Sequence, residues 1–346
     1  MKLRVGLIGL GPLWDLRYAP ALRALGDRFE VRAVCDHVAH RAEQAARAFQ
    51  ATAVDGFRAL LSRPDVDAVL VLAPHWYGAL PILAACEAGK AVFCAAALHV
   101  DLNEARGIKD RVEASGIAFM AEFPRRQAPA TLRLKELIAT QLGAPRLLFG
   151  HQRLATTAED DDHSDSTPPH GDRTNSWRNT RELLELVDWC RYVVGVEPSS
   201  VLGVSHQRGA TAGDVDYEMM SLDFSEPALP GRGPLAQISC GRYTPASWPE
   251  AAAFRPPAAL QVSCQRGIAF IDLPTTLIWF DRAGRHMESL DSERPVGEQM
   301  LSQFHRSVTS LVRNSASLDD AYRALAVVLA SRRSQRDGRR VAMEFR

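Results

Sequence analysis

The stretch that decides the fold begins at the third residue and reads Leu3-Arg-Val-Gly-Leu-Ile-Gly-Leu-Gly-Pro-Leu-Trp14. A helical pattern from Tyr18 to Leu25 follows it. A second apolar run, Phe29-Glu-Val-Arg-Ala-Val-Cys-Asp36, then ends in an acid. An apolar run, a glycine turn, a helix and a second run that ends in a carboxylate predict a βαβ unit of the dinucleotide-binding type. The competing interpretation is a parallel α/β unit that binds no nucleotide.

The glycine turn has the features of a phosphate site. Gly9 permits the tight turn, and Gly11 lets backbone N–H groups approach a pyrophosphate at the positive end of the helix. Asp36 lies 22 residues past Trp14, where a carboxylate accepts hydrogen bonds from both ribose hydroxyls. Trp14 replaces the third glycine of G-x-G-x-x-G, so its side chain either fills part of the pyrophosphate space or stacks against the cofactor. The loop residues assigned to the cofactor are Gly9, Gly11, Pro12, Leu13 and Trp14.

Size and composition indicate a globular protein of two domains. The chain has 346 residues, of which 46% are hydrophobic and 24% charged. Lys plus Arg and Asp plus Glu number 41 each, so nothing points to nucleic acid or a membrane as a partner. We expect no signal peptide and a cytoplasmic location. The cysteines have no metal-binding spacing, and we expect no metal site. Four of them lie in strongly apolar stretches, which suits buried thiols in a reducing compartment. The six are Cys35, Cys86, Cys94, Cys190, Cys240 and Cys264.

Strands alternate with helices over the first 120 residues or so. This pattern predicts an N-terminal Rossmann domain, residues 1–123, built on a doubly wound parallel sheet. The expected strands after Asp36 are residues 53–54, 66–74, 91–94 and 117–120, and the expected helices are 39–49, 57–61, 77–88 and 103–115.

The pattern changes near Pro124, and residues 124–346 predict an α+β domain built on an open, mainly antiparallel sheet. The expected strands are residues 146–154, 201–206, 217–224, 236–243, 260–264, 268–273, 277–280 and 340–345, and the expected helices are 129–141, 181–194, 297–312 and 318–333. A polar segment at 156–180 contains Asp160, Asp162, His163, Asp165 and His170. These residues could be drawn as a metal site, although such acidic stretches are usually solvated loops.

The order and spacing of several short motifs resemble the Gfo/Idh/MocA (glucose–fructose oxidoreductase/inositol dehydrogenase) family over nearly the whole chain. The resemblance implies a Rossmann domain, a second domain carrying the open sheet and a nicotinamide cofactor between them. It also implies oxidation or reduction of carbonyl and hydroxyl groups on sugars, cyclitols or related small molecules. The motifs are residues 5–22, Ala73-Pro74, Glu87-Ala-Gly-Lys90, Leu98, Glu104-Ala105, Pro124-Arg-Arg126, Asp188 with Gly195, Asp320-Ala321 and Gly338-Arg-Arg-Val341.

The departures from the family pattern fall on the chemistry. The family has Glu-Lys-Pro, with its proton-transferring lysine, where this chain has Ala95-Ala-Ala97. Its Asp and His, four residues apart on the 181–194 helix, correspond to Arg181 and Glu185, and a frequent His corresponds to Gly78. Alanine has no proton to move, and arginine does not give its proton up. The chain thus resembles a divergent member of the family, one that lacks the family's catalytic Lys, Asp and His.

Catalytic residues therefore stay unassigned, with two candidates. Glu185 is a base only if burial raises its pKa, and the competing interpretation is an i, i+4 ion pair with Arg181. His99 either reaches into the emptied catalytic site or is a solvent-contacting histidine at a helix entry. Further proton acceptors are His206, Tyr243 or a water molecule.

The remaining cofactor assignments lie at the carboxyl ends of the expected strands, where ligands bind in such sheets. Arg125 or Arg126 either holds a phosphate or an acidic substrate, or forms a salt bridge between the domains. We expect NAD over NADP, because a 2′-phosphate beside Asp36 places like charges together, with Arg41 and His37 softening that preference. The assignments added to the glycine loop are Asp36, His37, Ala73, Pro74, His75, Ala96 and Arg125.

Two functions fit these observations. The first is an NAD-linked oxidoreductase with an atypical proton route, and the second is an inactive nucleotide- or sugar-binding regulatory protein on the same fold. In either case the ligand is a small molecule. The uncovered face of the open sheet is expected to carry Val262, Phe270 and Ile278, which predicts a homodimer or homotetramer packed through the sheets.

Overall fold

The computed structural model describes residues 2–73, 77–95, 100–156, 171–207, 215–245, 247–248, 250–251, 254, 257–291, 293–310 and 316–345, with the backbone alone for 171–178 and 316–317. The chain divides into two compact units. The first unit is Met1–Gln127 with Arg294–Leu325, and the second is Ala128–Glu293 with Ala326–Arg346. The sequence analysis expected one boundary, at 123/124, and did not predict that residues 294–325 belong to the first unit. The expected boundary stays a prediction. None of the described helices is long and apolar enough to cross a membrane.

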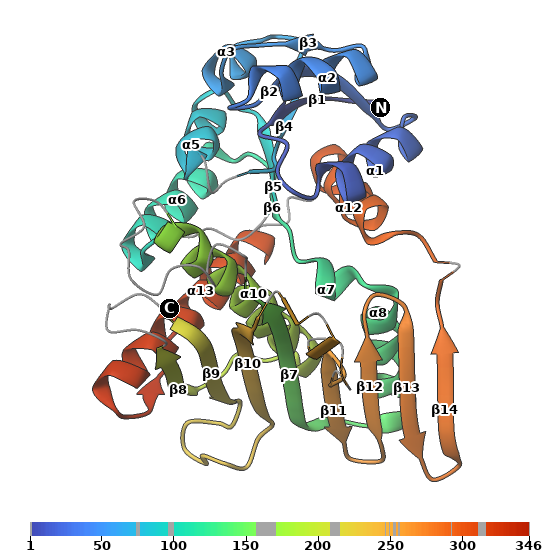
Figure 1. The fold of residues 1–346 in the computed structure, drawn as a ribbon, viewed down its shortest axis with the longest axis vertical. Coiled ribbons are helices and arrows are strands. Elements are labelled where there is room, and N and C mark those ends of the chain that lie inside the picture. Colours follow the sequence, from blue (N-terminus) through green and yellow to red (C-terminus); the bar gives the residue numbers. More distant parts are fainter. Residues whose placement is uncertain are drawn as a thin grey trace. The chain divides into compact units, whose positions relative to one another are not determined.

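The first unit contains a six-stranded parallel sheet in the order β3-β2-β1-β4-β5-β6 (Figure 1). The central strand β1 pairs with β2 on one side and β4 on the other, so the direction of winding reverses there. The doubly wound sheet is confirmed. Its strands are β1 (Leu3–Ile8), β2 (Phe29–Cys35), β3 (Thr52–Ala53), β4 (Ala68–Val71), β5 (Ala91–Cys94) and β6 (Phe119–Ala121).

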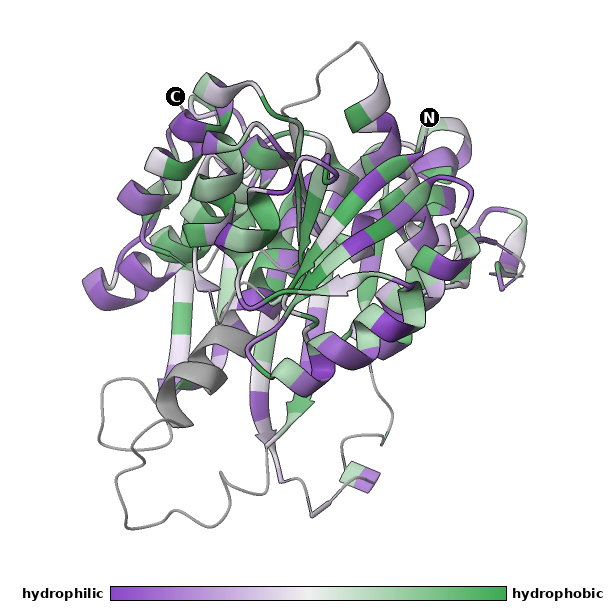
Figure 2. Ribbon diagram, turned by 90° about the horizontal axis from the view of Figure 1, so that it is seen from above, coloured by the Kyte–Doolittle hydropathy of each residue, from purple (hydrophilic) through white to green (hydrophobic). Residues whose placement is uncertain are grey.

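Helices cover both faces of this sheet, which explains its nearly continuous apolar strands. Every residue of β4 and β5 is buried. The strands are largely coloured as hydrophobic, whereas the helices alternate hydrophobic and hydrophilic residues along their length (Figure 2). The helices of the unit are η1 (Trp14–Tyr18, a π-helical turn), α1 (Ala19–Ala24), α2 (Ala39–Phe49), α3 (Phe57–Leu61), α5 (Leu80–Glu87), α6 (Leu102–Ser115), α7 (Pro124–Gln127), α12 (Val296–Thr309) and the first half of α13 (Ala316–Asp337).

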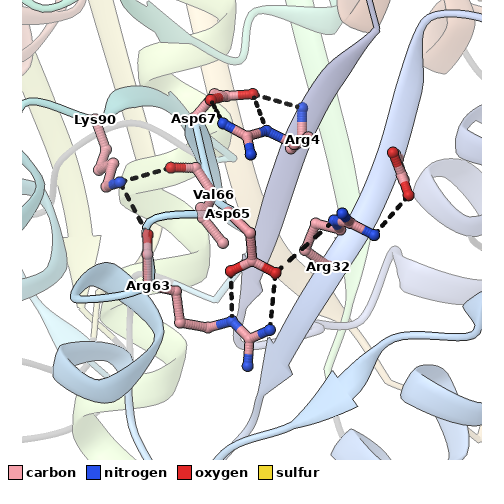
Figure 3. A network of polar contacts seen from close by, with 8 residues as sticks. Arg4, Arg32, Arg63, Asp65, Val66, Asp67 and Lys90 are labelled. Atoms are coloured by element: carbon pink, nitrogen blue, oxygen red, sulfur yellow. Dashed lines mark hydrogen bonds and ion pairs between the residues drawn. The ribbon is translucent and has the colours of Figure 1, made fainter.

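Ion pairs fasten the amino-terminal edge of the sheet, where β1, β4 and β5 begin (Figure 3). The Arg4 guanidinium donates to both carboxylate oxygens of Asp67, at 2.9 and 2.6 Å, and this contact lowers the pKa of Asp67. The Lys90 ammonium donates to the carbonyls of Arg63 (3.0 Å) and Val66 (2.6 Å). The lysine of the Glu87–Lys90 motif therefore closes the loop before β4, at the edge opposite the glycine turn.

The second unit contains a nine-stranded sheet in the order β14-β13-β12-β11-β7-β10-β9-β8-β15. Only β7 and β10 run parallel among the described neighbours, which confirms the mainly antiparallel sheet. The strands are β7 (Pro145–Ala155), β8 (Ser200–Gln207), β9 (Val215–Asp223), β10 (Leu235–Thr244), β11 (Leu260–Cys264), β12 (Ile268–Asp272), β13 (Thr276–Asp281), β14 (Gly284–Ser289) and β15 (Val341–Ala342). The sequence did not predict the polar edge strand β14.

Helices α8 (Pro129–Leu137, continued by the π-helical turn η2, Ile138–Leu142) and α10 (Gly171–Val194) belong to this unit. A Cβ at Gly150 of β7 would lie 3.5 Å from the Leu186 side chain, so this face of the sheet packs on α10. Val262 pairs with Leu148, two residues before Gly150, and is fully buried on the same face. Its expected place on the uncovered face was therefore wrong, because alternation does not say which set of side chains a helix covers.

The opposite face carries Phe270 and Ile278, which are cross-strand partners, as expected. Several large apolar side chains on it are exposed, and strand pairing joins them into rows: Leu235 beside Leu147, Met287 beside Ile278, and Phe280 beside Ile268. Leu202 and Val204 of β8 extend the apolar surface. Exposed apolar side chains grouped in this way are typical of an interface.

We expect the protein to form a homodimer or homotetramer through this face. Replacing Leu235→Glu should shift the protein towards monomers, because it places a charge within the apolar rows. Leu229→Glu, at an exposed leucine outside the strands, is the matched control and should leave assembly unchanged. Light scattering at micromolar concentration measures both, and a monomeric wild-type protein would contradict the prediction.

Candidate functional site: a glycine loop at the carboxyl edge of the parallel sheet

The glycine loop lies against the end of β4. Gly9 and Gly11 have φ angles of +65° and +66°, a region that side chains rarely adopt. A Cβ at Gly11 would lie 2.4 Å from the Leu72 carbonyl oxygen, and one at Gly9 would lie 2.8 Å from the Cβ of Ala73. The Gly9 N–H also donates to the Cys35 carbonyl at 2.8 Å. Glycine is therefore required at both positions for two reasons: the positive φ angle, and the close packing against Leu72 and Ala73.

The loop ends at the start of a helix whose first N–H groups have no intrahelical partners. Pro12 contributes no N–H, so the donors nearest the turn are those of Leu13 and Trp14. Such groups, with the positive end of the helix dipole, form an anion site of the kind that holds a diphosphate. The geometry therefore fits the loop residues predicted from the sequence.

Trp14 does not occupy the turn. Its side chain is only 7% exposed, belongs to the hydrophobic core, and packs against Phe49 with ring centroids 5.7 Å apart. The helix starts with a π-helical turn, in which the Tyr18 N–H donates to the Leu13 carbonyl at 3.3 Å. The structure therefore places the indole in the core, and neither position considered from the sequence describes it.

Asp36 fastens the end of β2 to the loop. Its fully buried carboxylate accepts the N–H of Leu10 at 2.8 Å and that of Val38 at 2.9 Å, and it lies 3.1 Å from His37 Nδ1. Arg41, in the first turn of α2, donates to the Gly11 carbonyl at 3.2 Å. The structure thus brings the predicted residues of this half of the site together.

Tyr77 is a neighbour of the loop that the sequence analysis did not single out. A Cβ at Gly9 would lie 3.0 Å from its ring, and the ring also packs against Phe57. Burial raises the pKa of the Tyr77 hydroxyl to about 12, with smaller contributions from Cys35 and Asp36. An aromatic residue three positions after Pro74 is the only signal the sequence offered.

Several predicted residues lie outside the described part of the chain: Pro74, His75, Ala96, His99 and the acidic segment with Asp160, Asp162, His163, Asp165 and His170. Among the described residues, no group of three His, Cys, Asp or Glu side chains could hold a metal ion. All six cysteines are buried and none forms a disulfide; the sequence had indicated burial for four of them. Burial raises the pKa of the Cys35 and Cys94 thiols to about 12, so both are inert core thiols.

The two arginines after β6 differ in their surroundings. Arg126 pairs with Asp320 at 2.6 Å and lies over the Phe123 ring, so this ion pair lies within the first compact unit. Arg125 is buried in α7, and its contact with a cofactor or substrate stays a prediction.

The candidate proton acceptors of the second unit are either paired with another side chain or exposed to solvent. Arg181 donates through Nε to Glu185 at 3.2 Å, which confirms the i, i+4 ion pair on α10. His206 Nδ1 lies 2.7 Å from Asp216, but the His206 side chain is 71% exposed. Tyr243 is also exposed and packs against Tyr217. Glu185 is thus paired with Arg181, four residues before it on the same helix.

Residues 3–123 match the family described as "Oxidoreductase family, NAD-binding Rossmann fold", GFO_IDH_MocA. Over those residues, which form the βαβ unit, the glycine loop and most of the first sheet, the chain is similar to the Gfo/Idh/MocA family of oxidoreductases.

The chain is similar to an inositol 2-dehydrogenase of Acidothermus cellulolyticus, with 32% identity over 214 residues, or 61% of this chain and 59% of that protein. It is also similar to a D-xylose 1-dehydrogenase (NADP(+)) of Hypocrea jecorina, with 33% identity over 131 residues, 36% and 34% of the two chains. Both alignments span less than two thirds of the relative. The crystal structure of an aldose–aldose oxidoreductase from Caulobacter crescentus, complexed with glycerol, shares the fold with a TM-score of 0.81 at 17% identity, covering 99% and 100% of the chains.

Replacing Gly11→Ala should abolish dinucleotide binding and lower stability, because the methyl group strains φ and collides with the Leu72 carbonyl. Gly89→Ala is the matched control, since Gly89 has a φ of +63° but open space around it. Both variants should lose about 1–2 kcal/mol from the backbone strain alone. Chemical unfolding and calorimetric titration with NAD measure the two effects. Equal NAD affinity in the two variants would contradict the assignment of the loop.

Proposed function

We propose that the protein is an oxidoreductase that uses a nicotinamide dinucleotide on a hydroxyl or carbonyl group of a small polyol, sugar or related compound. The glycine cradle carries the proposal. Its two left-handed glycines, closed on Leu72 and Ala73, leave no room for a side chain but lead directly to the N–H groups that start a helix. A fold of this kind has many functions, but such a cradle serves a phosphate-bearing ligand.

The residues present fit the dinucleotide. The N–H groups of Leu13 and Trp14 would hold the diphosphate, and Asp36 would hold the adenosine ribose at the end of β2. The bound nicotinamide supplies hydride transfer, and the protein supplies binding and orientation. The names of the relatives, among them polyol and sugar dehydrogenases, support the substrate class.

The proton must take a route different from the family's. The position of the lysine is Ala96, and Arg181 keeps its proton at all working pH values. Glu185 forms an ion pair with this cation at 3.2 Å, and taking up a proton would give up that contact. His99, His206, Tyr243 or a water molecule are the remaining acceptors.

The same ion pair favours a second candidate function, an inactive nucleotide- or sugar-binding regulatory protein. Arg181 and Glu185, which the resemblance aligns with two of the family's proton-handling positions, bind each other. The two functions share the dinucleotide site and differ only in turnover.

The usual polyol and aldose substrates should turn over at least 10²–10⁴ times more slowly than in a member with the complete proton relay, since this is the usual contribution of general acid–base catalysis. NADH formation at 340 nm over a substrate panel, for the wild type and Glu185→Gln, measures this. Ala96→Lys alone should not restore activity, because its partners are also missing. Brisk turnover that survives Glu185→Gln would reveal another proton acceptor; no turnover with intact NAD binding would favour the regulatory function.

NAD should bind more tightly than NADP. Asp36 ends β2, where the adenosine ribose is expected, and its negative charge would oppose that of a nearby 2′-phosphate. His37 and Arg41 reduce the difference without reversing it. Calorimetric titration of both dinucleotides checks the order of affinities, and tighter binding of NADP would overturn it.

A further inference from the structure

Helix α12, from near the far end of the chain, packs on the helix that follows the glycine loop (Figure 1). Gly297 stands at the closest approach. A Cβ there would lie 2.9 Å from both the Cγ and the carbonyl oxygen of Arg17, and 3.3 Å from the Cβ of Ala21. The two helices therefore meet at a separation that only glycine permits, and the contact falls within the π-helical turn.

The guanidinium of the same residue, Arg17, forms an ion pair with Glu122. Glu122 follows β6 and is only 1% exposed, and its N–H donates to the carbonyl of Cys94, the last residue of β5, at 2.8 Å. A buried carboxylate costs several kcal/mol unless a cation compensates it, so removing either partner is strongly unfavourable. The pair connects the helix after the glycine loop with the carboxyl ends of β5 and β6, where such sheets bind their ligands.

An aromatic row fixes the next residue of the turn. The Tyr18 ring packs edge-on against Phe93 of β5, with centroids 5.9 Å apart, and Phe93 packs against Phe304 of α12 at 5.7 Å. All three rings are buried. The sheet, α12 and the turn are thus joined by two chemically different contacts, one ionic and one apolar.

We propose that Arg17, Glu122 and Gly297 are positioning residues for the dinucleotide. They hold the π-helical turn, and with it the N–H groups of Leu13 and Trp14, at the distance from the sheet that the diphosphate requires. The need arises because Trp14 replaces the glycine that normally lets helix and strand pack closely. None of the three residues has to touch the ligand. This inference rests on the proposed function, since it assumes that a dinucleotide occupies the loop.

The test uses NAD and ADP, both of which carry a diphosphate, with calorimetric titration well below the unfolding temperature of each variant. Gly297→Ala pushes α12 against the turn, and Glu122→Gln removes the ion pair. Each variant should bind NAD and ADP more weakly than the wild type, and by the same factor for both ligands. We expect about tenfold, which corresponds to 1.4 kcal/mol of binding free energy. Gly107→Ala on α6 is the matched control, because a Cβ there meets nothing within 4 Å, and it should bind both ligands as the wild type does.

Arg17→Lys keeps the positive charge but loses the planar guanidinium. Its affinities for NAD and ADP should lie between those of the wild type and Glu122→Gln. This variant also tests the inference if Gly297→Ala does not fold. Unchanged affinities beside a lowered unfolding temperature would show a purely structural role and overturn the inference. Weaker binding of NAD with unchanged ADP would also overturn it, because the residues would then act on the nicotinamide half. Failure of the wild type to bind either ligand would contradict the proposed function itself.

Discussion

The close approach of the glycine loop to the end of β4 is the constraint on which the first unit depends. At Gly11 the backbone passes the Leu72 carbonyl so closely that even a methyl group would collide. This approach positions the start of the helix over the sheet edge and allows Leu10 to reach Asp36 at the end of β2. Two strands, a turn and a helix are thereby fixed relative to one another before any ligand binds, which is the preorganisation that a tight binding site needs.

The sequence predicted the βαβ unit well because its signals are local: an apolar run, two glycines and a terminal acid, all within 34 residues. The same holds for most of the second sheet, whose alternating strands are separated by turn residues. Features that depend on distant partners were not predictable. The core position of Trp14 requires Phe49 of α2, the burial of Val262 requires α10, and the return of residues 294–325 to the first unit leaves no local pattern.

The candidate site also has one part with a local signal in the sequence and one part without. The conformation of its glycine turn could be predicted, because the positions of Gly9 and Gly11 demand it, and a phosphate site is built from backbone N–H groups that such a turn presents. Its chemical half could not, because proton transfer depends on which side chains face the reacting oxygen. The structure shows one contact of this kind directly: Arg181 and Glu185, to which the resemblance in sequence assigns the positions of the family's Asp and His, bind each other. A scaffold can keep its ligand site while its chemistry changes, since the two rest on different residues.

A crystal structure of the protein soaked with NAD tests the central claim most directly. The account predicts a diphosphate against the N–H groups of Leu13 and Trp14, an adenosine ribose beside Asp36, and a Trp14 side chain that stays packed on Phe49. A dinucleotide bound elsewhere, or a Trp14 ring displaced from the core to make room for it, would contradict the account.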